Sequence, residues 1–479
     1  MHYYAYEMAH AVVSPMRFGM QAMRHTLEWP LNPWSNTSFG RNMAAACEVF
    51  ENLTRRYGKP EFGIKTTSVD GVPVPVRQET ALVKPFCNLL HFARDSEMTA
   101  KRDDPKVLMI APMSGHYATL LRGTVEAMLP DHDVYITDWA DAREIPIAMG
   151  RFDFDDFVDY VIEFVKFIGP NTHVIAVCQP AVPALVATAI MASRGEDCQP
   201  ASLVLMGGPI DTRRNPTKVN ELAGARSINW FEQNVVSAVP FPHVGFMRPV
   251  YPGFMQLTGF MTMNLERHMS AHVDLFNDLV KGDCDSVKQH QGFYEEYMSV
   301  MDLTAEFYLQ TVKTVFQDHS LPDRTLYHRN EFVDCSAIKQ TALMTVEGEK
   351  DDICGLGQTG AAHDLCSSIP ERDKVHYVQL GVGHYGVFNG TRWRTEIQPR
   401  IREFIRTLDF RRKEQESEKR GLMGYLTGGN KVAAKDIAAP VSERVSERAA
   451  ERPAERLKVK ANGHLNGTNG HHAPVEAGE

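Results

Sequence analysis

The segment from His173 to Met191 constrains the fold of this chain more than any other. It opens with the β-branched apolar run 173–177, which is typical of a buried strand, and it closes with the alanine-rich stretch 184–191, which favours a helix. Between the two lies one cysteine, Cys178. A sharp turn from strand to helix lifts its side chain clear of the sheet, and the positive end of the helix stabilises a thiolate there. The segment therefore predicts a candidate cysteine nucleophile.

The residues that flank Cys178 leave two interpretations open. Nucleophile turns of the G-x-S-x-G type carry glycine on both sides, and here Ala176 and Pro180 take those positions. Alanine is small enough for a close approach, and proline is well tolerated in the first turn of a helix. A single cysteine next to a strand can equally be an ordinary core residue. The choice depends on the rest of the chain.

Composition limits the class of protein. The chain has 479 residues, 43% of them hydrophobic, with a net charge of -9, which fits a large α/β domain with extra segments and argues against nucleic acid as a partner. The 8 cysteines show no C-x-x-C spacing, so we expect reduced thiols rather than disulfides or a metal site. Neither a signal peptide nor an apolar run of about 18 residues is visible, so we expect a cytoplasmic protein without integral membrane association.

Strand-like and helical segments alternate through residues 61–211 and again through 336–410. This alternation predicts a doubly wound, mainly parallel sheet, preceded by antiparallel strands. The expected strands are 62–68, 72–76, 86–92, 107–111, 134–137, 173–177, 202–206, 341–346 and 374–380.

Three further segments lie outside this alternation. Residues 1–60 predict a helical extension, rich in methionine and aromatic residues, that either packs on the core or contacts a hydrophobic partner. Residues 212–335, also rich in aromatic residues, predict a helical lid, with a separate small domain as the alternative. Residues 411–479 are highly charged with few apolar residues, which predicts a disordered tail.

Cys178, Asp351 and His384 each follow an expected core strand, in that order along the chain. The carboxyl ends of parallel strands meet at one edge of a sheet, so we expect the three side chains to lie together. A cysteine nucleophile, a histidine base and a carboxylate that orients the histidine are the groups that acyl transfer requires. Asp352 is the alternative acid, but we expect it to face solvent.

The loop 113–115 follows the expected strand 107–111 and contains a serine and a glycine. Such a loop supplies one backbone N–H of an oxyanion hole, and we expect Ser114 and Gln179 to donate the two N–H groups. An ordinary turn is the alternative. The order of nucleophile, acid and histidine is that of the α/β-hydrolase fold, so the predicted fold is an α/β-hydrolase with a mainly parallel doubly wound sheet and a helical lid insertion.

The motifs at 176–180 (AVCQP), 347–353 (EGEKDDI) and 383–388 (GHYGVF), with the tyrosine- and methionine-rich N-terminal segment, carry a resemblance. Through them, residues 1–410 resemble the intracellular poly(3-hydroxybutyrate) (PHB) depolymerases, which are related to polyhydroxyalkanoate synthases. Pro180 departs from the synthase pattern, which has glycine at this position. The resemblance implies a Cys-Asp-His triad, no cofactor, and an amorphous polyester granule inside the cell as substrate. We also expect no metal site.

We therefore expect a depolymerase that hydrolyses ester bonds of PHB granules in the cytoplasm through a thioester on Cys178. The alternatives are a polyhydroxyalkanoate synthase or acyltransferase and a non-catalytic granule-associated protein. Chain-length preference, endo or exo cleavage, water or coenzyme A as acyl acceptor, and the oligomeric state, a homo-oligomer included, stay open.

Overall fold

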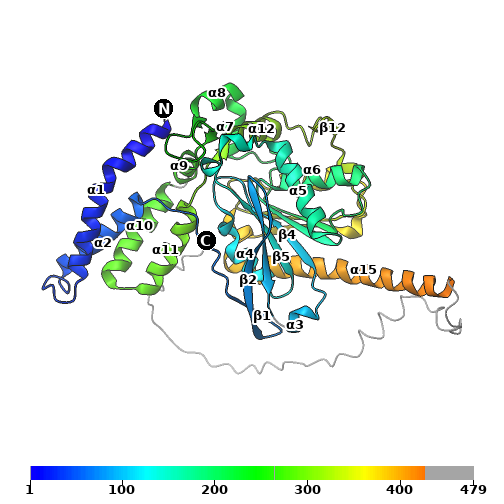
Figure 1. The fold of residues 1–479 in the computed structure, drawn as a ribbon, viewed down its shortest axis with the longest axis horizontal. Coiled ribbons are helices and arrows are strands. Elements are labelled where there is room, and N and C mark those ends of the chain that lie inside the picture. Colours follow the sequence, from blue (N-terminus) through cyan, green and yellow to red (C-terminus); the bar gives the residue numbers. More distant parts are fainter. Residues whose placement is uncertain (1, 96, 264, 427–479) are drawn as a thin grey trace, which may run out of the picture. The chain divides into compact units, whose positions relative to one another are not determined.

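The computed structural model describes residues 2–95, 97–263 and 265–426. The chain divides into two compact units, residues 1–409 and 410–479. The first unit holds the sheet, the insertion and all the candidate site residues, and Figure 1 shows its elements. Within the described residues, no helix combines the length and the apolar character needed to cross a membrane.

A nine-stranded sheet forms the centre of the first unit, in the order β1-β2-β3-β5-β4-β6-β7-β13-β14. The strands are β1 (Thr66–Val69), β2 (Val72–Val83), β3 (Cys87–Arg94), β4 (Lys106–Ile110), β5 (Asp133–Trp139), β6 (Thr172–Val177), β7 (Ser202–Met206), β13 (Ala342–Gly348) and β14 (Lys374–Gln379). The pairs β1–β2, β2–β3 and β3–β5 are antiparallel, whereas every pair from β5 to β14 is parallel. This is the α/β-hydrolase fold, and the expected mainly parallel sheet is confirmed.

The central strands are buried along their whole length because helices cover both faces of a parallel sheet. Every residue of β6 and β7 is buried, which explains their largely apolar sequences. Helix α5 (Phe154–Ile168) begins with a capping box between Asp153 and Asp156 and packs against α6 (Ala181–Ser193), as Figure 1 shows. Nearly all of α6 is buried, and its small alanine side chains allow close packing against α5, β6 and β7.

A long insertion separates β7 from β13. Its helices are α7 (Lys218–Ala225), α8 (Ile228–Asn234), α9 (Gly253–Met263), α10 (Leu265–Lys281), α11 (Cys284–Met298) and α12 (Ala305–Thr311). It also contains a small sheet of β8 (Ser237–Ala238), β9 (Pro249–Tyr251) and β10 (Leu303–Thr304), and a hairpin of β11 (Tyr327–His328) and β12 (Glu331–Phe332), which the sequence did not predict. These strands have only two or three residues, too few for a periodic pattern.

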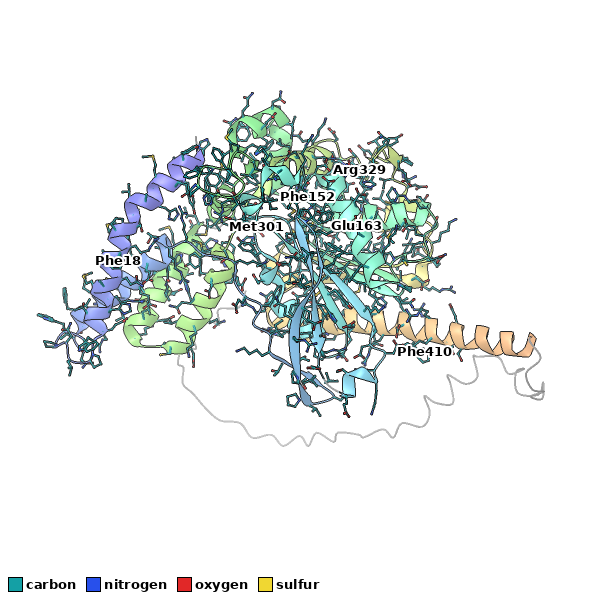
Figure 2. The ribbon with its side chains drawn as sticks, viewed as in Figure 1. Phe18, Phe152, Glu163, Met301, Arg329 and Phe410 are labelled. Carbon is teal, nitrogen blue, oxygen red and sulfur yellow. The ribbon has the colours of Figure 1, made fainter. Side chains whose placement is uncertain are left out.

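The N-terminal segment forms two helices, α1 (His2–Glu28) and α2 (Ser38–Thr54), which pack against each other. Helix α2 also packs against α10, so the two N-terminal helices are joined to the insertion through α2. Side chains on the outer face of α1 stay exposed, and Figure 2 shows Phe18 among them.

Helix α15 (Gln398–Leu426) corrects the expected boundary of the tail. The sequence predicted disorder from residue 411, but the helix continues to 426. Glutamate, lysine and arginine are good helix formers and pair along a helix surface, so a charge run by itself does not end a helix. Residues 427–479, the rest of the expected tail, lie outside the described residues.

Candidate active site

Cys178 occupies a sharp turn between β6 and α6. Its backbone has a φ of +65°, in the left-handed region that side chains other than glycine seldom adopt. Its N–H donates a 2.7 Å hydrogen bond to the carbonyl of Met206 at the end of β7. Strain of this kind, at a turn fixed by neighbouring structure, is typical of the nucleophile position in this fold.

The close packing that the turn requires is provided by the neighbouring strand. A Cβ atom on Gly208 would lie 2.1 Å from the Cβ of Ala181 and 3.1 Å from the carbonyl oxygen of Cys178. Gly207 and Gly208 follow β7 directly, so the glycines that a G-x-C-x-G turn would contain are replaced by glycines on another segment. Their role was not among the predictions from sequence. The sequence signal that could have revealed this role is the pair of successive glycines directly after a core strand.

The sheet register brings the ends of four strands to one edge. Ala176 of β6 pairs with Ile110 of β4 and with Leu205 of β7. Met206 of β7 pairs in turn with Val346 of β13. The loops that follow these strands therefore begin beside the Cys178 turn.

Asp351 and His384 meet at this edge. The Nδ1 atom of His384 donates a 2.7 Å hydrogen bond to Oδ2 of Asp351, and both side chains are buried. The other carboxylate oxygen of Asp351 accepts hydrogen bonds from the backbone N–H groups of Ile353 (2.9 Å) and Cys354 (2.8 Å). Asp352 is exposed, so of the two neighbouring acids it is Asp351 that the fold places against the histidine.

The Cys178 side chain lies close enough to His384 to affect its protonation. Burial lowers the pKa of His384, but the Asp351 carboxylate and the charge and hydrogen-bonding interaction with Cys178 raise it, so the pKa lies well above the ordinary histidine value. Gly207 completes this close arrangement, since a Cβ atom there would lie 3.2 Å from Cε1 of His384 and 3.4 Å from Oδ2 of Asp351. The structure thus brings the three expected triad residues together.

Ser114 lies half-buried in the loop after β4, and Gln179 follows Cys178. Within the described part of the chain, neither backbone N–H makes a hydrogen bond, which leaves both available to an oxyanion. The loop is held by the insertion, because the carbonyl of Gly115 accepts a 2.7 Å hydrogen bond from the N–H of Met301. Met301 is labelled in Figure 2.

Aromatic side chains of the insertion pack on the loops of the site. Phe260 of α9 lies 5.7 Å from His116, measured between ring centres, and Tyr297 of α11 lies 6.0 Å from Tyr385. Burial, Tyr297 and Cys178 together raise the pKa of Tyr385 well above its usual range, so Tyr385 stays neutral beside the site. Across the described residues, no group of three or more His, Cys, Asp or Glu side chains is arranged to hold a metal ion.

Several solved structures are similar to this chain at low sequence identity. A putative lipase (Lip1) from Acinetobacter baumannii AYE has 13% identity and a TM-score of 0.37, covering 70% of this chain and 93% of the lipase. A thermophilic esterase from Thermogutta terrifontis has 13% identity and a TM-score of 0.35, covering 72% and 97%. A monoacylglycerol lipase from Paleococcus ferrophilus has 12% identity and a TM-score of 0.36, covering 64% and 96%. At such scores, the fold assignment rests on the strand order and the Cys178 turn of this chain.

No curated protein matches the sequence. A family model does match it: residues 207–409 fit the model described as "PHB de-polymerase C-terminus". This range begins at Gly207 and includes the insertion, β13, Asp351, β14 and His384. Over this range the chain is therefore similar to the C-terminal part of the PHB depolymerase family.

Proposed function

We propose that this protein hydrolyses the ester bonds of PHB through a triad of Cys178, His384 and Asp351. Family and fold support ester hydrolysis. The observation that carries the proposal is the buried Asp351–His384 hydrogen bond beside a cysteine held at a φ of +65°. Nucleophile, base and orienting acid are the three groups that a covalent ester hydrolysis needs.

The geometry supports a two-step reaction. Asp351 holds the Nδ1–H of His384, so that Nε2 is the atom free to exchange a proton with Cys178. The Cys178 sulfur attacks the ester carbonyl as a thiolate, and His384 passes the proton to the departing alcohol, which leaves a thioester. Water, deprotonated by His384, then attacks the thioester and releases the acid and the thiol. The N–H groups of Gln179 and Ser114 stabilise the oxyanion in both steps.

The substrate is a polyester in the form of a cytoplasmic granule. Aromatic side chains of α9 and α11 that pack on the loops of the site provide an apolar surface for a chain of ester groups. Binding to a granule surface also explains why α1 carries several large exposed apolar side chains, among them Met8, Val12 and Phe18. The granule surface is the proposed partner.

The test is release of 3-hydroxybutyrate from native amorphous granules by the wild type and by a Cys178→Ala variant. We expect release by the wild type and a loss of several orders of magnitude in the variant, because triad members act as a unit. Cys198→Ala is the matched control, since Cys198 is a free, half-buried cysteine outside the site.

Equal release by the wild type and the Cys178→Ala variant would disprove the proposed nucleophile. No release by either protein would disprove the depolymerase activity. Consumption of 3-hydroxyacyl-coenzyme A with polymer formation would then assign a synthase, and granule binding without turnover would assign a coat protein.

A further inference from the structure

Helix α9 of the insertion is almost entirely apolar, and its few polar side chains differ in their surroundings. The hydroxyls of Thr258 and Thr262 donate 2.7 Å hydrogen bonds to the helix's own carbonyls at Phe254 and Thr258. Gln256 instead faces the loop that carries Ser114. A Cβ atom on Gly115 would lie only 2.5 Å from Oε1 of Gln256, so this loop accommodates the amide by having glycine there.

The amide oxygen of Gln256 is buried and has no hydrogen-bond partner among the described residues. The same holds for both polar atoms of the Gln179 side chain, which follows Cys178 directly. Buried polar atoms in folded proteins nearly always have a partner, so unpartnered ones need an explanation. Here they occur on the two segments that adjoin the expected oxyanion hole, the Cys178 turn and the helix over the Ser114 loop.

The chemistry of the amide group restricts which ligand fits. An ester group only accepts hydrogen bonds, so the interior of a polyester chain can satisfy an amide N–H but never an amide oxygen. The amide oxygen requires a donor, and the neutral donor in a hydroxyacid polyester is the hydroxyl at the free end of the chain. A hydroxyl also accepts, so it matches the N–H₂ group of Gln179 as well.

We propose that Gln256 and Gln179 bind the free 3-hydroxyl of the acyl unit that becomes attached to Cys178. The inference rests on the proposed function and adds the direction of cleavage. The acyl unit on the thioester carries the free hydroxyl, so the enzyme removes units from the hydroxyl end of the chain. The two glutamines determine specificity, whereas the triad performs the reaction.

Two p-nitrophenyl esters test the hydroxyl subsite, the 3-hydroxybutyrate ester and the butyrate ester, which differ only in that hydroxyl. We expect the wild type to have a kcat/KM at least about 100-fold higher for the hydroxylated ester. A site built to bind a hydroxyl has unpaired polar groups when the substrate lacks that hydroxyl. In Gln256→Met and Gln179→Met variants this ratio should fall toward one. Thr258→Val is the control on the exposed side of the same helix, and it should keep the wild-type ratio.

The direction of cleavage has its own test, which needs no variant. A 3-hydroxybutyrate trimer with a free hydroxyl end should release monomer, and the same trimer acetylated at that hydroxyl should release at least about 100-fold less.

These experiments distinguish failure of the hydroxyl subsite from failure of the proposed function. A wild type that hydrolyses both p-nitrophenyl esters with equal kcat/KM, or both trimers at equal rates, overturns the hydroxyl subsite and leaves ester hydrolysis intact. An unchanged ratio in both glutamine variants overturns the assignment of these residues. A wild type that hydrolyses none of the four compounds and no granules overturns the proposed function, and the inference falls with it.

Discussion

The Tyr3 hydroxyl donates a 2.7 Å hydrogen bond to Oδ2 of Asp302, 299 positions further along the chain, and the pair is buried. The other carboxylate oxygen of Asp302 accepts a 2.9 Å hydrogen bond from the N–H of Gly253, the first residue of α9. Met301, the residue before Asp302, donates a hydrogen bond from its N–H to the carbonyl of Gly115 in the loop of the candidate site. One short segment thus joins the N-terminal helix, the insertion and the catalytic loop.

A Tyr3→Phe substitution should lower the free energy of unfolding by about 1–3 kcal/mol, because it removes one partner of a buried carboxylate. Urea denaturation followed by circular dichroism measures the change. Tyr4→Phe on the exposed side of the same helix is the control and should stay within about 0.5 kcal/mol of the wild type. Equal effects of the two substitutions would show that the Tyr3–Asp302 hydrogen bond contributes nothing to the free energy of unfolding.

Asp302 should make stability depend on pH. Burial and the neighbouring Asp141 raise the pKa of Asp302 to about 7, and Arg143, the N–H of Gly253 and the Tyr3 hydroxyl oppose that rise. A carboxyl whose pKa is higher in the folded state binds its proton more tightly there, so its contribution is complete at low pH and is lost as the pH rises through about 7.

The free energy of unfolding of the wild type should therefore fall, relative to that of an Asp302→Asn variant, between about pH 4 and pH 7. Above this window the difference should be constant. Parallel profiles of the two proteins across the whole range would contradict the raised pKa.

Asp351→Asn should reduce kcat by roughly 10⁴-fold, since the histidine then loses the group that fixes its tautomer and stabilises its charged form. The same change should lower the pKa of His384, which the carboxylate raises. Kinetics on a soluble ester and a pH titration of the histidine measure the two effects. Asp352→Asn alters the exposed neighbour and should change kcat less than about 10-fold; a larger loss there than at Asp351 would reverse the assignment of the acid.

Gly207→Ala should reduce kcat by about 10- to 100-fold, because a 1 Å displacement of a catalytic group has a cost of that order. Gly207 has a φ of +56°, and a Cβ atom would meet His384 and Asp351. Gly224→Ala on α7 is the matched control: a Cβ atom there has no neighbour within 4 Å, so activity should not change. If the Gly207→Ala variant is fully active and folded, the close packing at this edge is not required.

Much of the fold follows from local patterns. The expected strand 202–206 coincides with β7, since a short apolar run is encoded in neighbouring residues. The capping box that begins α5 is likewise encoded within four residues. The chain order of Cys178, Asp351 and His384 also pointed to one edge of a parallel sheet. The oxyanion roles of Ser114 and Gln179 stay predictions.

Tertiary structure decided what depends on segments far apart in sequence. The sequence favoured Asp351 over Asp352, but the contact itself is tertiary: the N–H groups of Ile353 and Cys354 hold the Asp351 carboxylate beside His384. Likewise, no local pattern places Gln256 against Gly115 or Tyr3 against Asp302. The sequence by itself therefore determined the elements and the kinds of chemical group, because periodicity and turn residues act over a few positions. The fold decided which groups meet, because those contacts form only when distant segments close on one buried core.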